Sequence, residues 1–234
     1  MIPIRLYIMG HLASDDYWGL KIPRLVNYGP SGRPNVRSIK LVADGALGLW
    51  GAAMIEPYSD DSSTHGLLLS PPDVLAKNAA KFFFLKMGGR FKNIIDIFEK
   101  ELQTRNVSEI MQLSDLDRMG KLGTLASAQL THATSDMAYA ELRIGPEPHI
   151  YILMIKSPNH VLPIGSDFPI ESIDPLKGFY AAVAGLTPER NSPHGLGGWY
   201  PSEKLTRAQA LKGMTYDAAY AAFAEDNMAR LKRD

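Results

Sequence analysis

Short apolar runs alternate along the chain with longer stretches in which apolar residues recur every three or four positions. Runs that are rich in β-forming residues or close on turn residues predict strands at residues 4–9, 38–44, 123–129 and 161–169. The longer stretches predict helices at residues 71–85, 93–102, 114–122, 174–185 and 216–224. The apolar run at residues 150–155 fits either a strand or a buried helix. Strands that alternate with helices predict an α/β fold with a parallel sheet.

Several helix starts carry their own local signals. Ser70 is a candidate N-cap followed by two prolines, and Pro175 stands at the first position of the helix predicted after it. Thr206 and Gln209 have the spacing of a capping box ahead of the sequence ALKGM. These helix starts are therefore predicted more sharply than the other element boundaries.

Composition narrows the class of protein. The 234 residues are 45% hydrophobic and 21% charged, which is typical of a globular protein, and no linker divides them. The basic and acidic residues number 25 each and form no basic run, so a nucleic-acid partner is not expected. No apolar run approaches the length of a membrane span, and the first residues lack a basic leader, so we expect a cytoplasmic protein. With no cysteine, thiolate chemistry is excluded.

The stretch VLPIGSDFP at residues 161–169 places a carboxylate, Asp167, at the end of an apolar strand. In a barrel of parallel strands the carboxyl ends of the strands carry the chemistry. Gly-Ser-Asp is also an ordinary turn sequence, so the local pattern alone leaves both interpretations open.

Two further residues are candidates for chemistry. Lys40 stands within a predicted strand among apolar residues, where it either faces water on an edge strand or lies paired at the mouth of a barrel. His132 follows a predicted strand in the sequence THATSD, which places it in a loop where it is either structural or part of a pocket. Trp199 and Tyr200 fit a pocket wall or a packed aromatic corner equally well.

Five segments together resemble the amidohydrolase family 3 group, whose members are metal-dependent hydrolases of C–N bonds: KLVADGALG, EPYSDDSSTHGLLLSPP, QLTHATSDM, IGSDFPIESIDPLKGFYAAV and GGWYPSEKLTRAQALKGMTYDAAYAAFAED. The resemblance covers most of the chain. It implies a distorted TIM barrel, and here a partial (β/α)8 barrel that forms one domain over residues 1–234. It also implies a small amide-like molecule as the substrate if the chain is active.

The resemblance also implies roles for three residues. Lys40 matches a lysine thought to be a carbamylated metal ligand. Asp167 matches an aspartate that acts at the metal and takes a proton from the attacking water. His132 matches a histidine near the substrate, although Leu130 replaces the usual proline of that motif. The implied cofactor is a divalent metal, namely zinc.

The departures from the family pattern concern the metal site. The His-x-His of the first strand is absent, Leu85 or a missing block replaces the histidine of the fifth strand, and Val107 stands where the sixth strand has its histidine. A catalytic zinc takes three protein ligands, typically including histidines, so we expect this chain not to retain zinc.

Two hypotheses follow. In the first, the chain is an incomplete copy of a hydrolase that acts on non-peptide C–N bonds with metal-activated water, and it is inactive on its own. In the second, it is a non-catalytic pseudoenzyme or a truncated gene product. Because a barrel that lacks strands leaves sheet edges unpaired, self-association through those edges is expected in either case.

Overall fold

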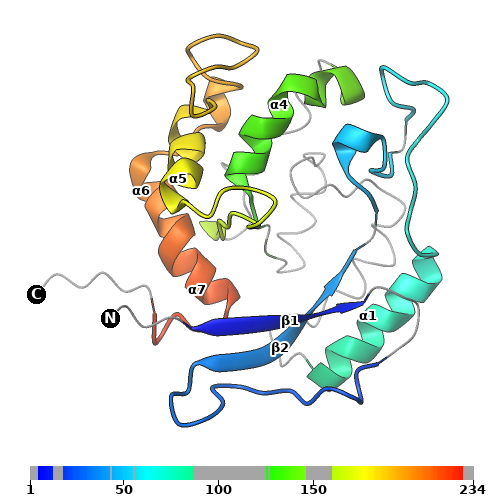
Figure 1. The fold of residues 1–234 in the computed structure, drawn as a ribbon, viewed down its shortest axis with the longest axis vertical. Coiled ribbons are helices and arrows are strands. Elements are labelled where there is room, and N and C mark those ends of the chain that lie inside the picture. Colours follow the sequence, from blue (N-terminus) through cyan, green and yellow to red (C-terminus); the bar gives the residue numbers. More distant parts are fainter. Residues whose placement is uncertain are drawn as a thin grey trace, which may run out of the picture.

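The computed structural model describes residues 5–12, 18–42, 44–54, 56–86, 125, 127–145 and 160–228. Within them the elements follow in the order β1 (Leu6–Leu12), β2 (Pro34–Leu41), η1 (Leu47–Leu49), α1 (Pro72–Lys86), α4 (Leu130–Ile144), α5 (Pro175–Ala184), η3 (Pro201–Glu203), α6 (Arg207–Lys212), η4 (Gly213–Asp217) and α7 (Ala218–Ala221) (Figure 1). The helices predicted at residues 93–102 and 114–122, and the apolar run 150–155, lie outside the described residues.

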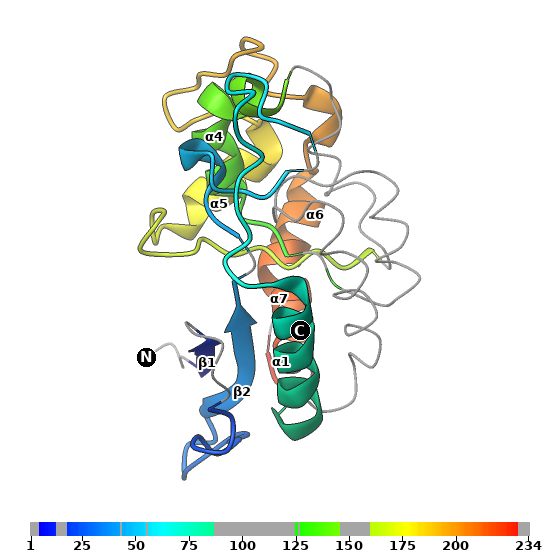
Figure 2. The ribbon, with the colours of Figure 1, turned by 90° about the vertical axis from the view of Figure 1, so that its right-hand side faces the viewer.

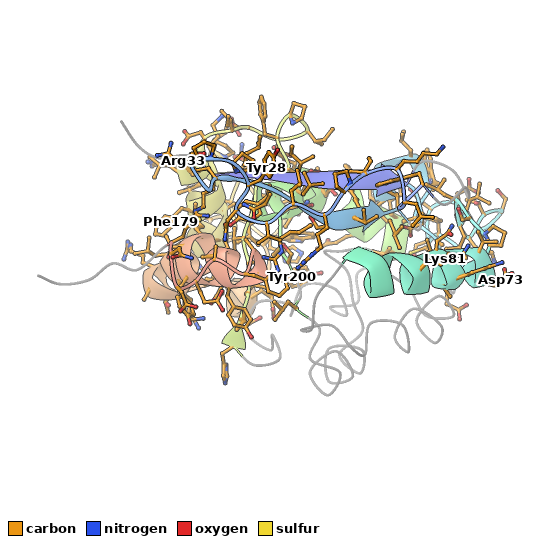
Figure 3. All side chains as sticks on the ribbon, turned by 90° about the horizontal axis from the view of Figure 1, so that it is seen from below. Tyr28, Arg33, Asp73, Lys81, Phe179 and Tyr200 are labelled. Carbon is orange, nitrogen blue, oxygen red and sulfur yellow. The ribbon has the colours of Figure 1, made fainter. Side chains whose placement is uncertain are left out.

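The strands β1 and β2 pair in parallel, with Leu6 opposite Pro34 and Leu12 opposite Leu41. A register irregularity between Ile8 and Met9 interrupts the pairing. Both strands were predicted, but β1 ends three residues later than expected and β2 begins four residues earlier. Helix α1 packs against β2 (Figure 2). Figure 3 shows Tyr28 and Arg33 in the loop that leads into β2.

A second parallel pairing, a single bridge between Ala128 and Ile164, stands where the sequence predicted strands at 123–129 and 161–169. Its two hydrogen bonds run from the Ala128 amide to the Pro163 carbonyl, at 2.9 Å, and from the Gly165 amide to the Ala128 carbonyl, at 3.0 Å. Parallel pairing is therefore confirmed at two places. Among the described residues these are short pairings and not a closed sheet.

Among the described residues, α4 is a long helix that the sequence prediction missed. His132 was expected in a loop, and that expectation is wrong, because it lies in the first turn of α4. The helix buries one face through Leu130, Ala133, Met137 and Ala140. That spacing is the signal for an amphipathic helix.

Helix α4 connects two apolar clusters. Leu130, at its start, packs with the bridge residues and α5 in the first cluster, which consists of Ala128, Leu130, Leu162, Ile164, Ala181, Ala182, Leu205 and Ala210. Its middle packs in the second cluster, which consists of Leu47, Ala52, Tyr58, Ala133, Met137, Ala140 and Trp199. The helix is therefore held between η1 and α5, as Figure 1 shows.

Two of the predicted helix starts, those of α5 and α6, are confirmed, whereas α1 begins at Pro72, two residues after the N-cap candidate Ser70. The Asp174 carboxylate accepts a hydrogen bond from the Leu176 amide at the start of α5, and Gly185 ends that helix in the left-handed conformation. Thr206 and Gln209 form the capping box of α6, in which the side chain of each accepts a hydrogen bond from the backbone amide of the other. The helix predicted at 216–224 begins earlier than expected, because α6, η4 and α7 follow one another without a break from Arg207 to Ala221.

Candidate functional site

The bridge between Ala128 and Ile164 brings two chain segments to one edge. Because the two segments run parallel, the residues that follow each of them emerge on the same side. His132 follows Ala128 across the start of α4, and Asp167 follows Ile164 across Gly165 and Ser166. The strand pairing therefore explains why two residues far apart in sequence meet.

The side chains of His132 and Asp167 face each other across a short gap. Nε2 of His132 lies 4.0 Å from Oδ2 of Asp167, which is too long for a direct hydrogen bond. One water or one substrate atom between them can contact both groups. The side chain of His132 is 18% exposed and that of Asp167 is 36% exposed, so the aspartate is the more accessible of the two.

The backbone at Asp167 has an unusual conformation. Its φ of 56° lies in the left-handed region, which costs a non-glycine residue about 1–3 kcal/mol. The turn is held by a hydrogen bond from the Ile170 amide to the Asp167 carbonyl, at 2.9 Å. The fixed turn presents the carboxylate at the end of the strand segment.

Two polar atoms at the start of α4 are buried and have no hydrogen-bond partner among the described residues. They are Nδ1 of His132 and the hydroxyl oxygen of Thr131, whose side chain lies at the start of α4. The imidazole therefore keeps one nitrogen unused while the other faces Asp167. The sequence analysis did not single out Thr131, since a threonine beside a histidine carries no pattern of its own.

Lys40, the third residue implied by the resemblance, stands near the end of β2 with an exposed side chain. Its side chain makes no hydrogen bond or ion pair with any described residue. It has the environment expected of a lysine on a strand that faces water. The described structure thus brings Asp167 and His132 together and leaves Lys40 apart from any described acidic partner.

The described donors do not fit a zinc ion. Within the described ranges no three histidine, aspartate or glutamate side chains lie close enough to hold a metal. Two ligand atoms on tetrahedral zinc lie about 3.3 Å apart, given bonds of about 2.0 Å, which is shorter than the observed gap. His132 and Asp167 therefore supply at most two donors, where a catalytic zinc takes three from the protein.

The aromatic pair Trp199 and Tyr200 forms a packed corner and not an open pocket wall. Oε1 of Glu141, on α4, accepts hydrogen bonds from the Trp199 indole at 2.7 Å and from the Tyr200 hydroxyl at 3.1 Å. Nε2 of His194 lies 2.7 Å from the same oxygen. Burial, together with the nearby charge of Glu141, raises the pKa of Tyr200 to about 12. This corner ties the loop after α5 to the end of α4.

Asp44, within the motif KLVADGALG, has a structural position. Its carboxylate accepts a hydrogen bond from the Ala53 amide at 2.9 Å, and burial raises its pKa above the usual range. Gly45 and Gly51 approach so closely that a Cβ on either would lie 3.1 Å from the other's Cα. The motif therefore leads into a tight loop after β2, in which Gly45 and Gly51 allow this close approach.

Comparison with known sequences decides the family. A model of the amidohydrolase family matches residues 98–233, which is more than half of the chain. The chain belongs to the amidohydrolase family. The matched region contains both His132 and Asp167, so the family assignment covers the candidate site.

Relatives in this family are considerably longer. The chain is 26% identical over 214 residues to "Protein LONG AFTER FAR-RED 3" of Arabidopsis thaliana, covering 82% of this chain and 36% of that protein. It is 26% identical over 251 residues to "Putative amidohydrolase YtcJ" of Bacillus subtilis strain 168, covering 98% of this chain and 45% of that protein. The chain thus spans less than half the length of these curated relatives.

Solved structures support an amidohydrolase fold. An uncharacterized metal-dependent hydrolase from Pyrococcus furiosus matches with a TM-score of 0.71 and 26% identity, over 92% of this chain and 45% of that one. A second uncharacterized metal-dependent hydrolase, from Pyrococcus horikoshii OT3, matches with the same TM-score at 24% identity. That match covers 91% of this chain and 44% of the other, and it supports the fold alone. In the part of the chain that the structure describes, no helix is long and apolar enough to cross a membrane.

Proposed function

We propose that this chain carries part of the active centre of a hydrolase that acts on non-peptide C–N bonds. The observation that carries the proposal is the meeting of His132 and Asp167 at the edge defined by the parallel bridge. In a (β/α)8 barrel this edge is where the chemistry takes place. The two parallel pairings are then pieces of one partial barrel domain.

The two side chains have separate roles in this proposal. The Asp167 carboxylate is the more exposed group and accepts a proton from the attacking water. His132 lies against the substrate, because Nε2 faces the gap while the rest of the ring is mostly buried. In this proposal a small amide-like substrate places one atom between the carboxylate and the imidazole.

We further propose that the chain on its own does not turn over substrate. The family implies a divalent metal and metal-activated water, and the described donors do not complete a zinc site. Lys40, the implied metal ligand, is exposed and has no described acidic partner. The same two observations favour the second candidate, a non-catalytic member of the family.

Hydrolysis and binding assays on the purified chain test both parts. The chain is incubated with added Zn²⁺ and a panel of small amides, such as N-acetyl amino acids and cyclic ureides, and compared with Asp167→Asn. No detectable turnover by either protein supports the proposed inactivity, whereas turnover that Asp167→Asn abolishes refutes it and assigns the chain as a working hydrolase. Turnover that persists in Asp167→Asn refutes the role given to Asp167.

Saturation-transfer NMR with the same amides tests the substrate role of His132 independently of turnover. We expect binding of at least one of the amides, and loss of that binding in His132→Ala. If no amide binds, or if His132→Ala binds the same amides equally well, His132 does not contact the substrate.

A further inference from the structure

The helix that packs against the Asp167 strand segment contains a π-turn. Five residues, η4, form it between α6 and α7, and the three elements run on as one helix (Figure 1). A π-turn has one residue more per turn than an α-helix and is often found at functional sites. Here it lies where the helix meets residues 160–164.

Gly213, the first residue of the π-turn, lets the helix approach the strand segment very closely. Its carbonyl accepts a hydrogen bond from the Ile164 amide at 3.2 Å. A Cβ at this position would lie 2.5 Å from Cδ1 of Ile164 and 2.8 Å from the Leu162 carbonyl oxygen. The backbone of Gly213 is ordinary and helical, so the close contact, and not φ, calls for glycine.

Asp217, the last residue of the π-turn, holds the same segment at a second point. Its side chain is almost wholly buried, and Oδ2 accepts a hydrogen bond from the Leu162 amide at 3.0 Å. Oδ1 pairs with the ammonium group of Lys212, five residues earlier, which also donates to the His160 carbonyl at 2.8 Å. The helix thus contacts His160, Leu162 and Ile164 in succession.

The opposite edge of this segment is bonded to Ala128, two residues before the start of α4. The segment from residue 160 to 165 is therefore held from both sides, by the helix and by the strand that leads into His132. Asp167 follows within two residues. Any sideways movement of the segment changes the gap between Asp167 and His132.

We propose that Gly213 and Asp217 are positioning residues, which set the separation of Asp167 and His132 through the strand segment between them. The catalytic meaning of that separation rests on the proposed function. The geometric part does not, because it concerns only where the two side chains lie. A buried carboxylate is an expensive way to gain stability alone, which favours a role in fixing geometry.

NMR of the full chain tests the geometric part without an activity assay. The variants are Gly213→Ala and Asp217→Asn. Gly178→Ala is the control for the first, because a Cβ at Gly178 meets nothing within 4 Å. Glu189→Gln, at an exposed glutamate, is the control for the second.

We expect the first two variants to shift the amide signals of residues 165–167 and the ring signals of His132, and the controls to leave them in place. Exchange of the Ile164 amide with solvent should become about five- to tenfold faster in Gly213→Ala, as expected for the loss of one hydrogen bond. Unchanged signals at Asp167 and His132, together with a loss of stability, would show a purely structural role and overturn the proposal.

Lys212→Gln is a milder variant that keeps the proposal falsifiable if the buried substitutions fail to fold. The Lys212 side chain is 45% exposed, so the protein should still fold when its ammonium group is removed. The substitution nevertheless removes the hydrogen bond to the His160 carbonyl and the ion pair with Asp217. We expect the same signals to shift in the same direction by less, and Lys212→Arg to restore them. No shift in Lys212→Gln would count against the proposal. If the signals behave as expected but no variant alters amide binding, the positioning is real and the substrate role proposed for this site is wrong.

Discussion

Replacing Glu141 by alanine is expected to destabilise the protein substantially, because one carboxylate oxygen serves three donors. The indole of Trp199 and the hydroxyl of Tyr200 donate to Oε1, and Nε2 of His194 lies within hydrogen-bond distance of it. The donors come from the loop after α5, whereas Glu141 lies near the end of α4. The substitution therefore cuts a connection between two elements and not only a surface contact.

The magnitude follows from how far each donor is buried. The indole of Trp199 is buried and cannot turn to water, so its unsatisfied N–H costs about 1–3 kcal/mol. Tyr200 and His194 are partly exposed and regain water, so each loses about 0.5–1 kcal/mol. We expect Glu141→Ala to lower the free energy of unfolding by about 2–5 kcal/mol. Glu141→Gln keeps an acceptor oxygen and should cost less than half of that.

Urea denaturation of the wild type and of both variants measures these free energies. Glu189→Ala, at an exposed glutamate, is the control and should change the free energy of unfolding by less than about 0.5 kcal/mol. A loss below about 1 kcal/mol for Glu141→Ala would refute the reasoning, because it would show that the Trp199 indole does not depend on this acceptor.

Titration of Tyr200 gives an independent readout of the same contact. The charge of Glu141 contributes to raising the pKa of Tyr200 to about 12, so in Glu141→Ala that pKa should move back toward 10. The phenolate absorbance, taken as the difference from Tyr200→Phe, isolates this tyrosine from the others. An unchanged titration would mean that Glu141 and Tyr200 do not interact in solution.

Three further outcomes are expected. After dialysis, elemental analysis of the purified chain should find no stoichiometric zinc. About one zinc per chain would refute this prediction, and Lys40→Ala and Asp167→Ala should then each remove the bound zinc. Size-exclusion chromatography should show oligomers, because β1 pairs only with β2 among the described residues and exposes Leu6. A single monomer peak would count against association through an unpaired edge of β1. Burial raises the pKa of Asp44, so the native state binds its proton more tightly than the unfolded chain. The free energy of unfolding should therefore fall as pH rises from about 3.8 through the raised pKa of Asp44. Urea denaturation at a series of pH values should show this fall in the wild type and not in Asp44→Asn. The same pH dependence in both proteins would contradict the prediction.

Local signals predicted several elements well. The caps at Asp174 and Thr206 involve side chains that bond to backbone groups two or three residues away, so the sequence alone contains the whole interaction. The alternation of strands with helices also predicted that strands would pair in parallel, as β1 and β2 do. Strand ends were placed less well, because pairing partners and not local residues set them.

Helix α4 was missed although its signal was present. Its start, at Leu130, has no side-chain cap, because Gln129 makes no capping hydrogen bond, and it contains threonine residues that have low helix propensity. The apolar positions Ala133, Met137 and Ala140 nevertheless follow helical spacing. Packing between η1 and α5 outweighs the weak local preference, which is the usual reason that tertiary structure overrides propensity.

The gap between His132 and Asp167 could not be predicted from neighbouring residues, because distant ones fix it. The sequence prediction began a helix at residue 216, three residues after Gly213, and assigned no role to that glycine. In the structure the helix continues through it, although glycine in a helix interior costs about 1 kcal/mol relative to alanine. The compensating contact is the Ile164 amide, which reaches the Gly213 carbonyl only because no side chain stands between them. A glycine that is unfavourable for its own helix therefore becomes intelligible only beside the strand segment that carries Asp167.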